Sequence, residues 1–465
     1  MRDMLHRIIE RAKANGVAFA DARYVENDST GIRLQDGRTE KLSQSIQKAV
    51  GVRVLVEGAW GFASTNRLSN RELEDCLDSA VGMAKAAEGK VAEPGVVELV
   101  EPRSDVVKAT VRRHPREVPM EKKVRRLLLF HKEAEAAGDG KLANVLVTYA
   151  DSYFREMVCN TIGTMVDDEQ IRVMVGTTVT AAERGVRQRG HKHVGGTAGY
   201  EMIEETEPAD VGGEAARSAV SLLSARRAPS GRFPVIFHPS ITGLFVHEAV
   251  GHNIEADLVF SGASIIAGRL GKAVASDLVT IVDDSTVRGL NGSYAYDSEG
   301  VRGGKRVLVE NGTLKGYLHS LETAARFGAK PTGSGRAQDA HSMPIVRMSN
   351  TFIEPGERSL DEVVGEMGEG ILLDEGEWGY VMTERGQFTC RAHRGQLIKD
   401  GKLADPIREV SVSGMTLQAL EDIDAVTREF ETDMPGTCGK QGQGAPVQGG
   451  GPYIRVKELV VGGQE

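Results

Sequence analysis

Cysteine is scarce in this sequence, and its cysteines lie far apart. The 465 residues include four, with no Cys-x-x-Cys pair: Cys76, Cys159, Cys390 and Cys438. Neither a disulfide framework nor a structural zinc cluster built from cysteine pairs is expected from that spacing.

Long apolar runs are also missing. No stretch reaches the roughly eighteen apolar residues that a membrane helix needs. Residues 1–16 do not show a charged region followed by an apolar one, the pattern of an export signal. We therefore expect a soluble chain in the cytoplasm.

The chain has no excess of basic charge. Its 57 Lys and Arg residues are outnumbered by 66 Asp and Glu residues, for a net charge of −9. This balance argues against a general nucleic-acid binder and against a protein of anionic membranes, so neither partner is expected.

Glycine, by contrast, is abundant. Its 55 residues are about twelve in a hundred, against an average near ~7%. Many of them follow Gly231, which indicates numerous tight turns and a β-rich C-terminal half. The length and a hydrophobic content of 40% are typical of two or three domains with sizeable cores.

Hydrophobic periodicity predicts an α+β fold in three parts. Residues 1–105 and 106–228 each have the pattern of a helix, a β-meander and a second helix, with helices near 4–12, 70–87, 119–137 and 210–225. Residues 229–465 predict one large β-rich domain, in which short strands alternate with glycine turns and a helix begins near Ser240.

That helix carries the motif with the clearest chemistry, His247-Glu248-Ala-Val-Gly-His252. Imidazole nitrogens bind zinc and other borderline metals, and a Glu beside a ligand can act as base toward a metal-bound water. The motif is one residue longer than H-E-x-x-H, whose histidines share one helix face.

The extra residue has a geometric consequence. In a regular α-helix an i, i+5 pair is ~140° apart around the axis, too far to share one ion. A single π-type turn would bring both rings to one face, and Gly251 is the residue that best permits a bulge or a helix end. The alternative is an apolar core helix that happens to carry two histidines.

A catalytic zinc needs a third protein ligand and an open position. The candidates are Glu255 and Asp257, distant histidines and the cysteines. Cys438 stands out because the small residues around it allow close backbone approach. An ordinary thiol in a flexible loop explains the same stretch equally well.

Several motifs in this order resemble the TldD/PmbA (TldD/TldE) family, most closely its metal-binding TldD branch. The resemblance covers most of the chain, and its main segments are 51–65 (GVRVLVEGAWGFAST), 247–252 (HEAVGH), 314–320 (LKGYLHS), 331–336 (PTGSGR), 348–353 (MSNTFI) and 438–447 (CGKQGQGAPV). Residues 379–388 depart from the family pattern, which affects substrate preference and subunit pairing more than catalysis.

The resemblance implies a zinc metallopeptidase that acts on unfolded or flexible peptides. Carried onto matching positions, it makes His247, His252 and Cys438 the Zn²⁺ ligands and Glu248 the general base. It also implies a homodimer, or a heterodimer with a PmbA/TldE-type sister subunit that lacks the metal motif.

On this hypothesis a metal-bound water hydrolyses the peptide bond, and Glu248 accepts its proton. The candidates for a hydrogen-bond donor to the oxyanion are Tyr317, His319, Arg336 and His341. We expect an exposed strand edge near the metal to hold an extended peptide through main-chain hydrogen bonds.

Two rival functions remain open at this point. The first is a non-catalytic peptide-binding or scaffolding subunit with a structural metal, all of whose coordination positions are filled by protein. The second is a cysteine hydrolase that pairs Cys438 with His247 or His252.

Overall fold

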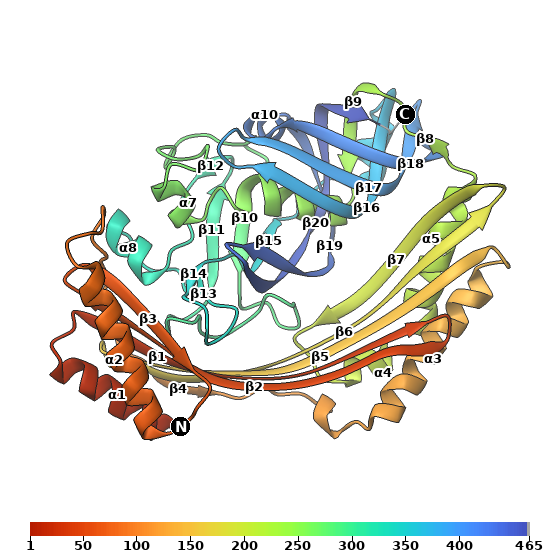
Figure 1. Ribbon diagram of the computed structural model, residues 1–465. Helices are drawn as coiled ribbons and strands as arrows, with labels where there is room; N and C mark the ends of the chain where they lie inside the picture. The colour runs from red at the N-terminus through yellow and green to blue at the C-terminus, as the bar shows by residue number, and fades with distance from the viewer. Residues whose placement is uncertain (463–465) are drawn as a thin grey trace.

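A long curved sheet forms the N-terminal half, and a second, β-rich body lies in its concavity (Figure 1). The computed structural model describes residues 1–462 and, at position 433, the backbone alone. The fold is mixed α and β with a large β-rich C-terminal portion, as the sequence predicts. No helix within the described part is long and apolar enough to cross a membrane.

The N-terminal sheet has seven strands in the order β3-β2-β1-β5-β6-β4, with β7 also paired to β6. β1 pairs with both β2 and β5, so strands from both predicted N-terminal units share one sheet. The strands are β1 (Phe19–Gln35), β2 (Arg38–Val56), β3 (Ala59–Thr65), β4 (Ser104–Val107), β5 (Leu142–Asn160), β6 (Met165–Glu183) and β7 (Val186–Gly196).

Alternation along β1 separates the two faces of this sheet, because successive side chains of a strand point to opposite sides. Ala22 and Ile32, at even positions, belong to the hydrophobic cores beneath the helices. Arg23 and Val25, at odd positions, contact the loop around Ala340 of the C-terminal body.

The helices of the N-terminal half pack in two groups at opposite ends of the sheet (Figure 1). The first group buries the apolar faces of α1 (Arg2–Ala14) and α2 (Asn70–Ala87). The second consists of α3 (Met120–Ala137) and α5 (Glu214–Leu223), with the short α4 (Glu201–Glu205) beside them.

The C-terminal body is built on an eleven-stranded sheet. Its order is β12-β11-β10-β15-β20-β9-β16-β17-β18-β8, and β19 pairs with β20. The strands are β8 (Arg226–Arg227), β9 (Gly231–Phe237), β10 (Ile281–Asp284), β11 (Lys305–Glu310), β12 (Thr313–Leu314), β15 (Asn350–Ile353), β16 (Glu369–Met382), β17 (Gln387–Lys399), β18 (Lys402–Met415), β19 (Ile423–Lys440) and β20 (Gln443–Gly462).

Five short helices and a small hairpin complete this body. The hairpin pairs β13 (Gly335–Arg336) with β14 (Ile345–Val346). The helices are α6 (Pro239–Val246), α7 (Ala256–Phe260), α8 (Leu321–Phe327), α9 (Leu360–Gly365) and α10 (Thr416–Glu421). α6 is buried on nearly every side, since all of its residues except Leu244 are buried.

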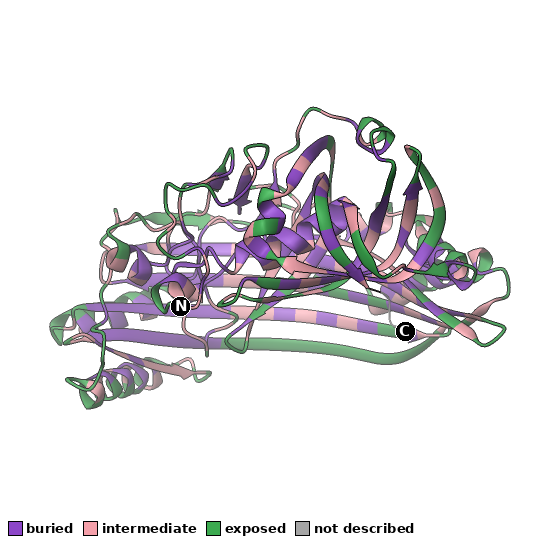
Figure 2. Cartoon of the chain, turned by 90° about the horizontal axis from the view of Figure 1, so that it is seen from above, coloured by how far each residue is buried: buried purple, intermediate pink, exposed green. Residues whose placement is uncertain are grey.

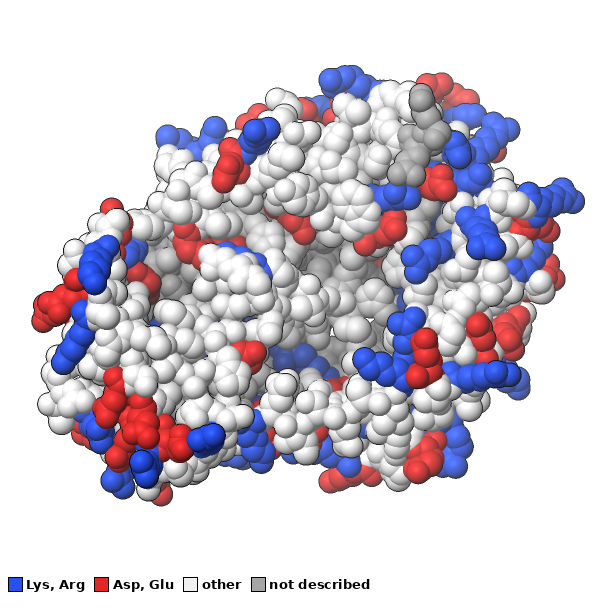
Figure 3. All heavy atoms as spheres, viewed as in Figure 1, with Lys and Arg blue, Asp and Glu red and all other residues white. Residues whose placement is uncertain are grey.

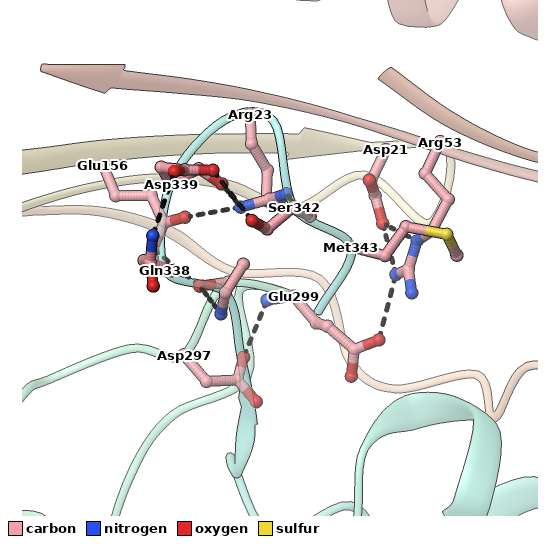
Figure 4. A network of polar contacts seen from close by, with 12 residues as sticks. Asp21, Arg23, Arg53, Glu156, Asp297, Glu299, Gln338, Asp339, Ser342 and Met343 are labelled. Atoms are coloured by element: carbon pink, nitrogen blue, oxygen red, sulfur yellow. Dashed lines mark hydrogen bonds and ion pairs between the residues drawn. The ribbon is translucent and has the colours of Figure 1, made fainter. Parts of the chain in front are cut away.

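Buried ion pairs and hydrogen bonds of two arginines join the two halves (Figure 4). Arg53 contacts both Asp21 of its own sheet and Glu299 of the C-terminal body, the latter at 2.9 Å. Arg23 contacts Glu156 at 3.1 Å and donates to the backbone oxygen of Ser342. Because breaking one partner would leave a buried charge unpaired, these contacts fix the position of the C-terminal body on the sheet.

Candidate metal centre

The predicted π-type turn is present at the end of α6. His238 caps the helix by accepting a hydrogen bond from the Ser240 amide at 3.2 Å, and Pro239 occupies its first turn. A π turn then spans His247–Gly251, and the His252 amide donates to the His247 carbonyl at 3.2 Å, an i→i+5 bond. As a consequence, the centroids of the His247 and His252 imidazole rings lie 5.2 Å apart.

Two glycines allow this helix to pack closely against its neighbours. A Cβ on Gly243 would lie 2.2 Å from the Gly450 amide nitrogen of β20, and one on Gly251 would lie 2.0 Å from Met348 Sδ. Both distances are far below van der Waals contact. α6 therefore packs against β20 at Gly243, and the motif packs against Met348 at Gly251, in each case where a side chain would collide with its neighbour.

Cys438 reaches the two histidines from β19. Its Sγ lies 3.4 Å from His252 Nε2, and one ligand atom from each of His247, His252 and Cys438 lies within 4.8 Å of the others. Arg347 donates to the Cys438 carbonyl, which fixes the backbone at this point. Two imidazole nitrogens and a sulfur are donors that suit zinc.

The electrostatics favour a thiolate at this position. Burial alone would raise the pKa of Cys438, but the hydrogen bonds and charges of His247 and His252 lower it to about 5. Burial likewise opposes protonation of His252, whereas Cys438 and Glu255 raise its pKa to about 10. The thiolate is the form of cysteine that binds metals and attacks carbonyls.

Glu248 and the three clustered residues line one cavity of about 520 Å³. Burial raises the pKa of Glu248, although the histidines partly oppose that shift. A Cβ on Gly379 of β16 would lie 3.0 Å from Glu248 Cγ. The divergent segment 379–388 therefore begins in the cavity wall, to which Gly379, Tyr380, Val381 and Thr383 contribute.

Glu255 and Asp257, the other candidates for a third ligand, lie outside this cluster. Glu255 Oε2 is 2.9 Å from His252 Nδ1, behind the ring, and 3.1 Å from Lys440 Nζ. Lys440 also donates to Asp257 at 2.7 Å. Sequence reasoning did not single out Lys440, although it stands two residues after Cys438.

None of the four oxyanion candidates is among the residues that line this cavity. Three are engaged elsewhere: Tyr317 donates to the Ile266 carbonyl, Arg336 donates to the Met348 carbonyl, and His341 lies 2.8 Å from Ser64 Oγ. His319 is buried near Thr323. Tyr380 supplies a hydroxyl-bearing side chain to the cavity wall.

Two strand edges border the cavity. β16 pairs with β17 along 369–382, but its other edge meets β9 only at 371–373. β19 pairs with β20 along 434–440, and within residues 1–462 its other edge has no ladder partner there. Residues of both segments line the cavity, so unpaired main-chain groups border it on two sides.

Comparison with known proteins covers nearly the whole chain. Residues 20–84, 113–223 and 230–463 match domain 1, the central domain and the C-terminal domain of the PmbA/TldA metallopeptidases. A protein of Methanothermobacter thermautotrophicus named metalloprotease is 37% identical over 447 residues, which are 96% of each chain. A metalloprotease TldD homolog of Haemophilus influenzae is 30% identical and aligns over 99% of this chain and 96% of its own.

A third relative is named for a metal. The zinc metalloprotease TldD homolog of Saccharolobus solfataricus is 27% identical over 99% of this chain and 100% of its own. Among solved structures, a Thermotoga maritima protein matches with a TM-score of 0.82 at 25% identity, over 99% of both chains. TldE from Thermococcus kodakarensis has the same fold, with a TM-score of 0.81 at 18% identity over 99% of this chain and 100% of its own. The chain belongs to the PmbA/TldA metallopeptidase family.

Proposed function

We propose that this protein is a zinc-dependent peptidase that hydrolyses peptide bonds in unfolded or flexible peptides, with residues 229–465 as its peptidase domain. The observation that carries the proposal is the convergence of His247, His252 and Cys438 beside Glu248 in one cavity. The names of the family relatives support a metallopeptidase, and one of them includes zinc.

His247, His252 and Cys438 would hold the ion. When bound, zinc supplies a Lewis acid that polarises the substrate carbonyl and lowers the pKa of water. All four cysteines are free and buried, which is compatible with the reducing cytoplasm as the compartment that keeps a thiolate ligand intact.

Glu248 would act as the base. Its burial raises the pKa of its carboxyl group, which makes its carboxylate a better proton acceptor than an exposed one. It takes the proton from the attacking water and returns it to the leaving amine.

An extended peptide would lie between the open edges of β16 and β19. Main-chain hydrogen bonds to strand edges do not depend on the side chains of the peptide, so we expect a loose preference for the residues around the cleaved bond. A folded protein already uses its main-chain groups in its own ladders, so compact substrates would be excluded.

The contact of 3.4 Å between Cys438 and His252 also favours a second candidate, a cysteine hydrolase. A structural metal is less well supported, because no fourth His, Cys, Asp or Glu joins the cluster among the side chains that the structure describes. Chelation and alkylation distinguish these chemistries.

The ligand set makes a separable prediction. His247→Ala, His252→Ala and Cys438→Ala should each lose zinc, whereas Glu248→Gln should keep zinc and lose hydrolysis. Metal content by mass spectrometry and peptide cleavage are measured on each variant. A chelator should abolish wild-type cleavage and added zinc restore it; activity that survives chelation and is lost on alkylation would establish the cysteine hydrolase instead.

A second prediction concerns Glu255, which orients His252 from behind. Glu255→Gln should weaken zinc binding by about 10- to 100-fold, as removal of a metal ligand's carboxylate partner does. A competing chelator measures the affinity. Glu310→Gln, which changes an exposed carboxylate paired with Lys315, is the matched control and should bind zinc like the wild type. An unchanged affinity in Glu255→Gln would remove this positioning role.

The strand-edge account predicts selectivity for unfolded substrates. One protein, offered folded and chemically unfolded, should be cut only in the unfolded form, and peptides scrambled around the cut bond should be cleaved at similar rates. Gel and mass analysis give the rates. Equal cleavage of the folded form, or absolute dependence on one residue, would require a shaped specificity pocket in place of strand edges.

Assembly follows from another free edge. Beyond its pairing with β1, β2 has no partner along 38–49 among the described residues, and 38–48 are all exposed (Figure 2). We propose that this edge, with Leu42 and Ile46 exposed by 48% and 63%, pairs with a second copy or a TldE-type sister subunit.

Light scattering of the purified chain, alone and with a sister chain, tests the assembly. We expect a mass near twice 50.1 kDa, and about half of it for Leu42→Asp/Ile46→Asp. Leu99→Asp, at an exposed apolar residue away from this edge, should not change the mass. An active wild-type monomer would contradict the proposal.

A further inference from the structure

A second cavity, of about 380 Å³, lies where the C-terminal body faces the N-terminal sheet. Strands β5 and β6 provide one wall, and the loop that carries Tyr294 and Tyr296 provides another. The tip of the β19–β20 hairpin completes it through Thr437, which also lines the metal-centre cavity. Figure 3 shows the molecule hollowed between its two halves, with basic side chains at the lower wall of the hollow.

Two guanidinium groups line this cavity without a carboxylate partner. Arg172 donates only to neutral acceptors, namely the carbonyls of Asn291 and Ser293 and the side-chain oxygen of Gln170. Arg336 donates through Nη1 to the Met348 carbonyl and stacks 4.8 Å from the Tyr294 ring. Neither forms a salt bridge with a described residue, although Arg336 is buried and Arg172 is partly buried.

The acidic groups of the same cavity are already engaged. Glu156 pairs with Arg23 at 3.1 Å and accepts from Ser298 at 3.0 Å. Asp297 accepts from three backbone amides, those of Glu299, Val301 and Gly335, at 2.8–3.0 Å (Figure 4 includes the first of these). These two carboxylates therefore leave the charges of Arg172 and Arg336 without a contacting anion.

The two arginines also influence each other. Burial lowers the pKa of Arg172 to about 9, and the positive charge of Arg336 contributes to the shift, while the negative charge of Asp168 partly opposes it. Burial lowers the pKa of Arg336 as well, although the negative charge of Asp283 partly opposes this shift. A bound anion between them would remove this unfavourable interaction, and guanidinium groups match the planar geometry of a carboxylate.

We propose that this cavity binds the carboxylate at the end of a peptide, with Arg172 and Arg336 as its partners. The inference rests on the proposed function for the identity of the ligand as a peptide. Thr437 borders both cavities and precedes Cys438, so a peptide that crosses the metal centre can extend its C-terminal end toward the arginines. The aromatic rings of Phe154, Tyr294 and Tyr296 give the last residues an apolar wall.

Binding to the full-length Glu248→Gln protein tests the inference, because it requires no hydrolysis. Calorimetry compares three N-acetylated peptides of one neutral sequence: one with a free C-terminal carboxylate, one with a C-terminal amide, and one amide with glutamate as its last residue. We expect the free carboxylate to bind at least about tenfold more tightly than the plain amide. Equally tight binding of the glutamate peptide would assign the site to carboxylates of either source.

A matched pair of variants tests whether Arg172 recognises the carboxylate of the peptide. Arg172→Gln should abolish the difference between carboxylate and amide peptides. Arg155→Gln, which removes an arginine of the same sheet that is paired with Asp167 at 2.8 Å and does not line the cavity, should preserve it. Thermal unfolding confirms that both variants are folded, and Arg336→Gln is an independent replacement.

Equal binding of all three peptides to the Glu248→Gln protein would overturn the inference without any use of a variant. That result is distinct from failure of the proposed function, which would be the absence of metal-dependent cleavage by the wild type whatever the end of the peptide.

Discussion

The i→i+5 hydrogen bond from the His252 amide to the His247 carbonyl is the constraint on which the site depends. A regular helix would turn the second imidazole away from the first. With the π turn, both rings reach the sulfur of Cys438, and Glu248 stays in the same cavity. Close packing against β20 and Met348 holds the π turn in place, since a Cβ on Gly243 or Gly251 would collide with these neighbours.

The contacts between the two halves have a different character. The site itself lies within the C-terminal body, where apolar packing dominates. The junction with the N-terminal sheet instead uses buried charged groups: Arg53 pairs with Glu299, and Arg23, itself paired with Glu156 of its own sheet, donates to the Ser342 carbonyl. Buried pairs add little net stability, but they tolerate few alternative alignments because each charge must meet its partner. The second cavity depends on that alignment, since its walls come from both halves.

The sequence predicted the geometry of residues that are close in the chain, but not the contacts between residues that are far apart in it. The spacing of His247 and His252 showed that the two rings can share one ion if the helix contains a π turn, because helix geometry relates sequence interval to angle. Cys438 could not be chosen from its surroundings; only the family resemblance selected it, and the structure brings its sulfur to His252. The place of Glu255 behind His252 depends on Lys440, which no local pattern connects to it.

Strand β1 shows the same limit in the fold. Its odd positions include Asp21 and Arg23, which interrupt the apolar alternation by which a strand is predicted. Both are buried only because their partners Arg53 and Glu156 arrive from other strands. A strand covered on both faces, one by helices and one by ion pairs, has no simple hydrophobic period.

The position of β20 in its sheet has a consequence for the synthesis of the protein. This strand, residues 443–462, lies between β15 and β9 and pairs with β19, which carries Cys438. His252 is made 186 residues before Cys438. Because a chain leaves the ribosome from its N-terminus, the N-terminal sheet can fold while the C-terminal body still lacks its central strand. The three clustered side chains can meet only after residue 438 has emerged, so a growing chain that still lacks β19 cannot assemble the centre.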